Sequence, residues 1–285
     1  MAGILQLCAT PIGNLGDMSP RIIECLQNAD LIAAEDTRNS LKLLNHFGIH
    51  TPMTSYHEHN KVEKAGVLIR QLREGKNIAL ITDAGTPAIS DPGEVLVKMC
   101  ADEGIEVTSL PGPCACITAL TLSGLDTRRF VFEGFLSRDK KERREALNRL
   151  ENETRTVIIY EAPHHLKGTL EDLKENLACG GSRKIALCRE LTKKFEEVIR
   201  TTIESALAKY EDEEPKGEYV LVIEGRSEDD LKAEMTAKWE NMSIEDHVKM
   251  YEDTGLDRKE AMKKAAKDRG VSKRDIYAAL QKDMP

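Results

Sequence analysis

The residues best suited to chemistry form one loop, Thr82–Gly93, with the sequence TDAGTPAISDPG. This loop directly follows the apolar run NIALI, which predicts a buried strand. In an open parallel sheet, ligands bind beyond the carboxyl ends of strands, where small residues let the backbone approach them closely. A plain turn needs only about four residues. The longer loop, with its two aspartates and two prolines, therefore predicts a small-molecule site.

A second loop of this kind follows the first predicted strand and reads ATPIGNLGD, from Ala9 to Asp17. Its two glycines resemble those of a nucleotide-binding loop. The Rossmann spacing G-x-G-x-x-G is absent, however, and no P-loop lysine follows. We therefore expect neither NAD nor a nucleoside triphosphate as the ligand.

Several ionisable residues in other loops could move a proton or bind a polyanion. Histidine accepts a proton near neutral pH without much tuning, because its ordinary pKa is about 6.5. The candidates by residue type are Glu35, Asp36, His57, Glu58, His59, Glu161, His164, Arg189, Glu190, Lys193 and Lys194. A simpler interpretation stands beside each role. The histidines would lie in a solvated loop, and the segment EDTR would cap a helix, with its acids at the positive end of the helix dipole.

These loops join elements that alternate between short β-rich runs and amphipathic stretches, the rhythm of a mostly parallel sheet with crossover helices. The expected strands of the first lobe are ILQLCAT, LIAAE, TPMTSYH, NIALITD and IEVTSL. The expected helices are Ser19–Asn28, Leu41–Phe47, Lys61–Glu74 and Glu94–Glu103. Ser19 followed by Pro20 is typical of an N-cap and a first helical residue.

The segment Leu110–Pro113 cannot continue a strand, because it holds two prolines, and predicts a hinge or a shaped binding loop. A second set of alternating elements runs on to about Gly225. The chain then mixes acidic and basic residues, and its last part predicts a helix, a stop at Gly270, an N-cap at Ser272 and another helix. We expect an α/β lobe over residues 1–112, a second over 113–225 and a helical appendage over 226–285.

The composition limits the possible functions. A net charge of −8 argues against a protein that coats nucleic acid through bulk charge. No apolar run reaches the roughly 20 residues of a membrane span, and the first residues lack the basic start of a secretory signal. We therefore expect a cytoplasmic protein without a membrane contact. The seven scattered cysteines predict neither a disulfide framework nor a metal site.

Nine motifs, in order along the chain, resemble those of a family of small-subunit ribosomal RNA ribose methyltransferases within the tetrapyrrole methylase superfamily. They are ATPIGNLGDMSPR, EDTR, SYHEHN, ITDAGTPAISDPG, LPGPCA, FVFEGFL, YEAPHH, RELTKKFEE and GEYVLVIEG. The resemblance implies a two-lobed class III methyltransferase fold, with S-adenosylmethionine in a cleft between the two α/β lobes. It also implies a homodimer.

Carried over position by position, the resemblance also implies which residues line the site. The cofactor contacts would be Leu15, Asp83, Ala84, Gly85, Thr86, Ile89, Cys114, Ala115, Tyr160 and Thr201, the last where the family has a glycine. We divide the ionisable residues near the cleft between chemistry and substrate binding. The catalytic candidates are His57, Glu58, Glu161 and Lys194. The substrate-binding candidates are Glu35, Arg38, His59, Arg189 and Lys193.

The implied function is 2′-O-methylation of a cytidine in the decoding region of 16S ribosomal RNA. We expect it to act on an assembled small subunit, because folded RNA offers shape and splayed bases for recognition. One alternative is a tetrapyrrole C-methyltransferase, although those enzymes resemble G-x-G-x-G-D in the first loop, where this chain reads ATPIGNLGD. Another is a non-catalytic module that binds S-adenosylmethionine or the ribosome.

Overall fold

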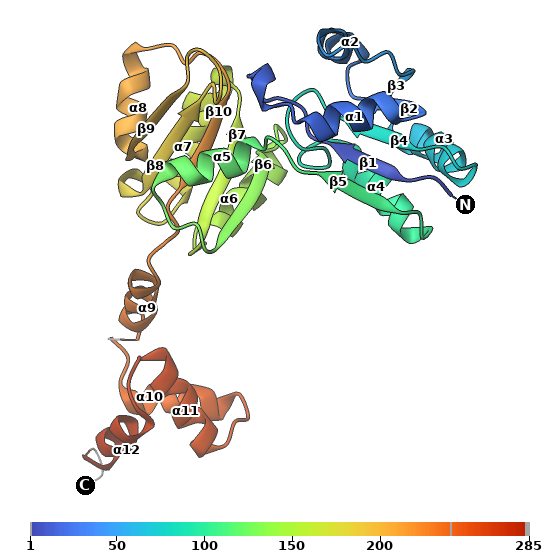
Figure 1. The fold of residues 1–285 in the computed structure, drawn as a ribbon. Coiled ribbons are helices and arrows are strands. Elements are labelled where there is room, and N and C mark those ends of the chain that lie inside the picture. The colour runs from blue at the N-terminus through green and yellow to red at the C-terminus, as the bar shows by residue number, and fades with distance from the viewer. Residues whose placement is uncertain (1, 240, 283–285) are drawn as a thin grey trace.

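The computed structural model describes residues 2–239 and 241–282, and it holds two five-stranded sheets followed by a helical tail (Figure 1). Each sheet carries helices on its faces and forms one lobe. The two lobes lie side by side and are joined just before helix α5, whereas the tail extends beyond the second lobe. The division at residues 112 and 225 stays our proposed domain assignment.

The first sheet has the strand order β3-β2-β4-β1-β5, and all of its pairs are parallel. Its strands are β1 (Leu5–Cys8), β2 (Leu31–Ala34), β3 (Met53–Ser55), β4 (Ile78–Ile81) and β5 (Val107–Leu110). Every residue of β4 is buried, as is typical of a parallel strand covered on both faces. This order brings the carboxyl ends of β1, β4 and β5 to adjacent positions on one edge.

The helices of the first lobe cover both faces of this sheet. They are α1 (Pro20–Asn28), α2 (Thr37–His46), α3 (Lys61–Arg73) and α4 (Gly93–Asp102). Ser19 caps α1 by accepting a hydrogen bond from the backbone N–H of Ile22, with Pro20 as the first helical residue. This confirms the predicted start. Helix α2 begins four residues before the predicted Leu41, because Asp36 caps it ahead of the first apolar residue.

The second sheet is mixed, with the strand order β6-β7-β10-β8-β9. Its strands are β6 (Phe130–Phe135), β7 (Thr156–Glu161), β8 (Lys184–Arg189), β9 (Glu197–Thr202) and β10 (Tyr219–Ile223). Strands β6 and β7 are parallel, whereas β10 runs antiparallel to both β7 and β8. The central strand is therefore the last one in the chain, and its first residues lie beside the last residues of β7 and β8.

Helices also cover both faces of the second sheet. They are α5 (Ala115–Ser123), α6 (Lys140–Leu150), α7 (Leu166–Asn176) and α8 (Ile203–Asp212). Helix α5 packs on one face, where its Ala119 and Leu120 contact a core that includes Ile158 and Val222. The other three helices share the core on the opposite face. The start of α5 therefore stands directly at the junction between the lobes.

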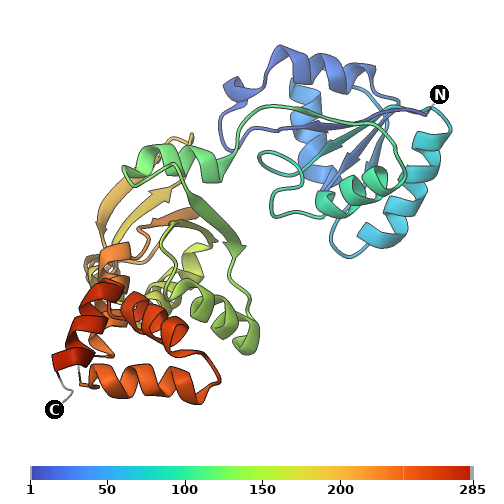
Figure 2. The same cartoon turned by 90° about the horizontal axis from the view of Figure 1, so that it is seen from below.

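The tail forms a helical unit with a core of its own. Its helices are α9 (Glu228–Ala237), α10 (Ile244–Asp253), α11 (Arg258–Asp268) and α12 (Lys273–Lys282). Helices α10, α11 and α12 gather around Val248, Ala265 and Ile276 (Figure 2). Gly270, with φ of +64°, ends α11, and Ser272 caps α12, so the predicted stop and restart are confirmed. In the part of the chain that the structure describes, no helix is long and apolar enough to cross a membrane.

The buried centre of β10 gives a direct test of the second core. Leu221 is fully buried, and we expect Leu221→Ala to lower the free energy of unfolding by about 2 to 5 kcal/mol, because it leaves a cavity. Leu41→Ala is the matched control, since Leu41 is 51% exposed. Urea denaturation of the full chain measures both. Equal effects of the two substitutions would contradict this assignment of the core.

Candidate active site

Three loops are tied together at the carboxyl edge of the first sheet. Thr10 and Gly85 exchange two backbone hydrogen bonds, with N···O distances of 2.9 and 3.1 Å. The hydroxyl of Thr86 donates to the carbonyl of Pro113 at 2.9 Å. Thr10 follows β1, Gly85 and Thr86 follow β4, and Pro113 follows β5. The bonds therefore join the three loops into one rigid unit. The Pro113 contact lies where the chain enters the second lobe.

Gly85 is required at this junction for two reasons. Its φ is +88°, a left-handed conformation that residues with a side chain rarely adopt. A Cβ atom added there would also lie 3.3 Å from Cγ2 of Ile12 and 3.5 Å from the carbonyl oxygen of Pro113. The loop therefore lets backbone from all three strands meet without an intervening side chain.

The second lobe contacts the same loops at two further glycines. A Cβ atom on Gly13 would lie 2.4 Å from Cγ of Lys193, and one on Gly134 would lie 2.6 Å from Oγ of Ser90. Gly13 belongs to the loop after β1, and Ser90 belongs to the loop after β4. The two lobes thus meet directly around these loops, and a side chain at either glycine would force them apart.

A cavity of about 400 Å³ lies at this junction and draws residues from both lobes. The loop after β4 forms one wall, and the ends of β7 and β8 with the start of β10 form the other. The first lobe contributes Ile12, Glu35, Thr82, Asp83, Ala84, Gly85, Thr86, Ile89, Ser90 and Asp91. The second contributes Cys114, Ala115, Phe135, Tyr160, Glu161, Ala162, Cys188, Glu190, Leu191, Lys193, Glu218, Tyr219 and Val220.

The ionisable side chains around the cavity are mainly acidic. The carboxylates among the lining residues are Glu35, Asp83, Asp91, Glu161, Glu190 and Glu218, and the cation is Lys193. A concave site lined mainly by one sign of charge concentrates ligands of the opposite sign. The cavity therefore favours a ligand that carries positive charge, and it disfavours the close approach of several phosphates.

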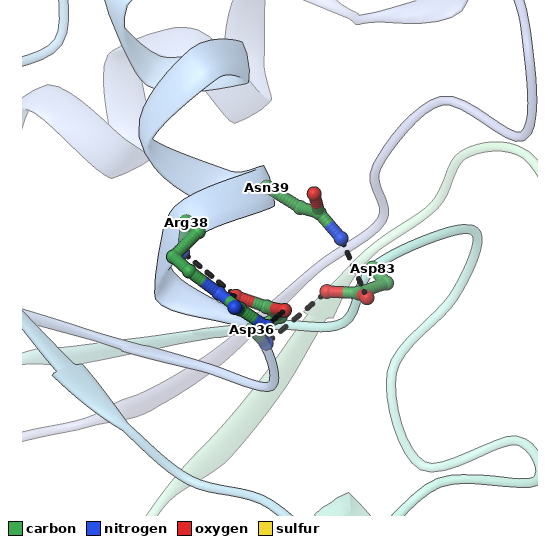
Figure 3. A network of polar contacts seen from close by, with 4 residues as sticks. All are labelled: Asp36, Arg38, Asn39 and Asp83. Atoms are coloured by element: carbon green, nitrogen blue, oxygen red, sulfur yellow. Dashed lines mark hydrogen bonds and ion pairs between the residues drawn. The ribbon is translucent and has the colours of Figure 1, made fainter.

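Asp83 joins the cavity wall to the start of α2 (Figure 3). Its carboxylate accepts hydrogen bonds from the backbone N–H of Asp36 at 3.1 Å and from the side-chain amide of Asn39 at 3.3 Å. Asp36 in turn pairs with Arg38, whose hydrogen bonds lower the pKa of the Asp36 carboxyl to about 2. This network orients the Asp83 loop relative to the neighbouring strand β2.

On the other side of the cavity, Tyr160 holds the first turn of α5. Its hydroxyl accepts a hydrogen bond from the backbone N–H of Cys116 at 3.1 Å, and burial raises its pKa above the ordinary value. The Sγ atoms of Cys114 and Cys116 lie 3.3 Å apart. The hydrogen bond with Cys116 lowers the pKa of the Cys114 thiol below its ordinary value, although burial opposes that shift. Cys114 therefore presents a polarised sulfur to the cavity.

An ion-pair network closes the edge of the cavity between β8 and β10. Lys193 donates to Glu190 at 2.9 Å and to Glu218 at 2.8 Å. The backbone N–H of Glu218 also bonds to Glu190, which lowers the pKa of the Glu190 carboxyl. Burial lowers the pKa of Lys193, but its bonds to the two glutamates outweigh this effect and raise it overall.

Backbone strain is concentrated in the two loops beside the cavity. Ala88 and Ser90 in the loop after β4, and Glu190 and Thr192 in the loop after β8, have φ values between +49° and +68°. Such a conformation costs roughly 1 to 3 kcal/mol for a residue with a side chain, and it persists where the surroundings enforce it. Strained residues of this kind cluster at binding and catalytic sites, which supports a functional role for the cavity.

The structure brings many of the predicted site residues into the cavity wall. These are Glu35, Asp83, Ala84, Gly85, Thr86, Ile89, Cys114, Ala115, Tyr160, Glu161 and Lys193. Glu161 is buried, and both of its carboxylate oxygens accept hydrogen bonds, one from the hydroxyl of Thr169 and one from the backbone N–H of Ala162. Its contacts are thus those of a residue that holds the wall in place.

Other predicted residues lie outside the cavity wall. Leu15 is 44% exposed in the loop after β1, and Thr201 lies on the edge strand β9. The segment after β3 carries three more, and Glu58 there pairs with Lys61 at 2.6 Å. The full set outside the wall is Leu15, Arg38, His57, Glu58, His59, Arg189, Lys194 and Thr201.

Arg189 and Lys194, the two outer cations of the second lobe, also have partners. Arg189 pairs with Glu197 at 2.9 Å, and it lines a separate polar hollow beside α8. The ammonium of Lys194 lies 5.5 Å from the ring centroid of Phe195, an exposed aromatic side chain. Their roles in the reaction stay predictions.

Sequence reasoning missed several residues of the second wall. Tyr219, at the start of β10, lies opposite Glu161 of β7 and Arg189 of β8. Phe135 ends β6 and stands 5.5 Å from Tyr160, measured between ring centroids. Both belong to motifs that carried the family resemblance, FVFEGFL and GEYVLVIEG. Tyr219 reaches the cavity through the antiparallel pairing of β10, and Phe135 through the parallel pairing of β6 with β7. The pattern of single segments reveals neither pairing.

The fold and the cleft between its lobes define a class of protein. Residues 5–207 match the family model of the Tetrapyrrole (Corrin/Porphyrin) Methylases, and the chain therefore belongs to the tetrapyrrole methylase family. Among solved structures, diphthine synthase has a TM-score of 0.60 at 14% identity, over 79% of this chain and 91% of that one. Uroporphyrin-III-C-methyltransferase from Thermus thermophilus has a TM-score of 0.55 at 18% identity, over 78% and 94%. These likenesses confirm the expected two-lobed methyltransferase fold.

More similar relatives narrow the comparison within that family. A protein of Halalkalibacterium halodurans is 50% identical over 96% of this chain and 93% of its own length. Relatives from Bacillus subtilis and Escherichia coli O157:H7 are 48% and 45% identical, over 97% and 96% of this chain and 94% and 93% of their own lengths. All three are named ribosomal RNA small subunit methyltransferase I.

The polarised thiol at the cavity gives a pH-dependent test. Cys116 and nearby backbone N–H groups hold the pKa of the Cys114 thiol below its ordinary value, and the thiolate is the form that reacts with iodoacetamide. We expect its alkylation rate to rise with a midpoint below that of an ordinary cysteine, whose pKa is about 8.5. In Cys116→Ala the midpoint should move upward, because the donor to the Cys114 sulfur is lost. Mass spectrometry of the labelled peptide measures both, and an unchanged midpoint in the variant would contradict the pairing.

Proposed function

We propose that this protein transfers a methyl group from S-adenosylmethionine to ribosomal RNA of the small subunit. The observation that carries the proposal is identity of 45–50% over nearly the whole chain to relatives that bear this activity in their name. The cavity at the lobe junction supports it, because it offers a cleft lined by the loops that the family resemblance singles out.

The cavity suits S-adenosylmethionine in size and in charge. Its volume of about 400 Å³ lies within the roughly 300 to 1,000 Å³ of small-molecule sites. The acidic lining favours a ligand with a sulfonium and an ammonium group. Asp83, Ala84, Gly85 and Thr86 would hold it from the first lobe, and Ala115 would leave room for it in the second. When bound, the cofactor supplies an electrophilic methyl group on sulfur.

At finer detail, we propose that the acceptor is the 2′-hydroxyl of a cytidine in the decoding region, as the family resemblance implies. This hydroxyl must lose its proton as the new bond forms, and a positioned base speeds that step. Glu35 lines the cavity, and the hydroxyl of Thr82 donates to its Oε2 atom at 2.6 Å. That bond fixes the carboxylate while its other oxygen remains available to accept a proton. We therefore assign the base to Glu35.

This assignment changes the roles that we expect for other candidates. Glu161 has both oxygens engaged, so we give it a positioning role. His57 and His59 lie after the edge strand β3 and away from the cavity wall, and we place them among groups that contact RNA at the cleft mouth. A homodimer, on the family resemblance alone, and the cytoplasmic site of action expected from the sequence are also part of the proposal.

A direct test incubates the purified protein with methyl-labelled S-adenosylmethionine and one of three acceptors. These are small subunits that lack the modification, the free ribosomal RNA and a porphyrinogen. We expect label in the subunits, at a nucleotide whose 3′-phosphodiester resists alkali, because a methylated 2′-oxygen cannot attack it. Label in the porphyrinogen alone would instead support a tetrapyrrole methylase. No label in any acceptor would favour a protein that only binds.

The role of Glu35 is tested by Glu35→Gln, which keeps the shape and the bond to Thr82 but removes the base. We expect kcat to fall by a factor of about 10² to 10⁴, with cofactor affinity changed little. Glu24→Gln is the matched control, because Glu24 is exposed on α1 and lies outside the cavity wall. Steady-state kinetics and calorimetric titration with S-adenosylmethionine measure the two effects. Equal activity of the two variants would exclude Glu35 as the base.

A further inference from the structure

The last two helices of the tail, α11 and α12, reverse the charge of the rest of the chain. The whole protein carries −8, yet residues 258–281 hold eight basic and three acidic residues. Most of these cations lie on α11, which carries four lysines between Lys259 and Lys267. The acidic cavity at the lobe junction disfavours phosphates. These two helices therefore form a cationic region that lies away from the lobe junction (Figure 1).

The lysines of α11 share its outer side. Ala261 and Ala265 are buried in the tail core, whereas Lys259, Lys263 and Lys267 are exposed. Residues four apart lie on the same side of a helix, about 6 Å from one another along its axis. The three side chains therefore form a continuous cationic stripe on the face that does not pack.

The charges of this stripe are not neutralised by neighbouring carboxylates. Among residues 2–239 and 241–282, no Asp or Glu oxygen lies within 4.0 Å of the ammonium groups of Lys259, Lys263 or Lys267. In the same tail, Lys232 and Lys238 each lie close to a glutamate of α9. A cationic stripe left unpaired on a stable helix is the electrostatic feature of a surface that binds a polyanion.

Helix α12, which follows the turn at Gly270, adds a further exposed cation and an exposed aromatic side chain. Arg274 is exposed, and Tyr277, one helical turn later, is 53% exposed. Gln281 donates from its amide to the Tyr277 hydroxyl at 3.0 Å, which orients the ring. Ser272 and Asp275 already cap the helix, so the side chains rather than the helix end supply the contacts.

We propose that α11 and the exposed side of α12 form an RNA-docking surface, separate from the cleft, that binds phosphates of the small-subunit RNA away from the target nucleotide. The surface is called the basic stripe here and comprises Lys259, Lys263, Lys267, Arg274 and Tyr277. Its cations match phosphates, and an exposed tyrosine offers a face on which an unpaired base stacks. This inference rests on the proposed function for the identity of the RNA.

RNA is favoured over an acidic protein because the methyl acceptor itself is a polyanion that the cleft repels. A substrate with many phosphates can enter an acidic cavity with one nucleotide only if other contacts hold the remainder. Phosphate contacts supply most of the affinity of proteins for nucleic acids and position them without reading sequence. The basic stripe supplies such phosphate contacts away from the cleft. The acidic lining that favours a cationic cofactor and the cations that favour RNA therefore lie in different parts of the protein.

The test compares two triple variants of the full-length protein. Lys259→Gln/Lys263→Gln/Lys267→Gln removes the three lysines of the basic stripe. Lys232→Gln/Lys238→Gln/Lys249→Gln removes the same charge from exposed lysines in α9, at its C-terminal end and in α10. Binding to purified 16S ribosomal RNA and to unmodified small subunits is measured by filter retention over about 50 to 200 mM salt. Circular dichroism and calorimetric titration with S-adenosylmethionine show that the fold and the cleft are intact.

We expect the stripe variant to bind RNA at least tenfold more weakly, with a salt slope shallower by about 2 to 3, because each lost phosphate contact removes about 0.7 to 0.9. Its KM for subunits should rise while kcat at saturation stays unchanged. Equal losses in both triple variants, or weaker binding to the subunits but not to the free RNA, would overturn the proposal. Binding is measured without methyl transfer. If the proposed function is wrong, the wild-type protein leaves the acceptors unlabelled, and this result is separate from the binding result.

Discussion

The paired backbone hydrogen bonds between Thr10 and Gly85 are the constraint on which the site depends. They join the loops after β1 and β4, and Thr86 fastens the same unit to Pro113, where the chain enters the second lobe. Gly85 makes this possible, because it adopts a left-handed conformation and leaves room for the side chain of Ile12 and the carbonyl group of Pro113. The second lobe packs against these loops, and the cavity lies where the loops and that lobe meet.

A cationic cofactor and a phosphate backbone need surfaces of opposite charge, and the protein has these surfaces in different regions. The cleft gathers carboxylates around a single lysine, which suits a cationic cofactor. The tail gathers unpaired lysines on α11, which suit a phosphate backbone. The net charge of −8 describes neither region. Because exposed charges are screened over about 8 to 10 Å at physiological salt, the two regions act independently, and the local pattern of charge decides what each one binds.

The two walls of the cavity owe their shape to different forces. In the first lobe, the backbone bonds between Thr10 and Gly85 fix the loops, and the hydroxyl groups of Thr82 and Thr86 add hydrogen bonds to Glu35 and Pro113. In the second, side-chain contacts dominate: Tyr160 holds the first turn of α5, and Lys193 links Glu190 to Glu218. The strained residues Glu190 and Ser90 show that both walls are held against their local preferences.

The sequence by itself determined the local features of this protein. The run NIALI and the cap at Ser19 define a strand and a helix through burial and hydrogen bonding among near neighbours, and the loop Thr82–Gly93 marks the site. Only the tertiary structure decided which distant segments meet there. It brought Tyr219 beside Glu161, engaged both oxygens of Glu161 and left His57 outside the wall. Strand order and antiparallel pairing depend on packing between residues far apart in the chain, and no local pattern records that packing.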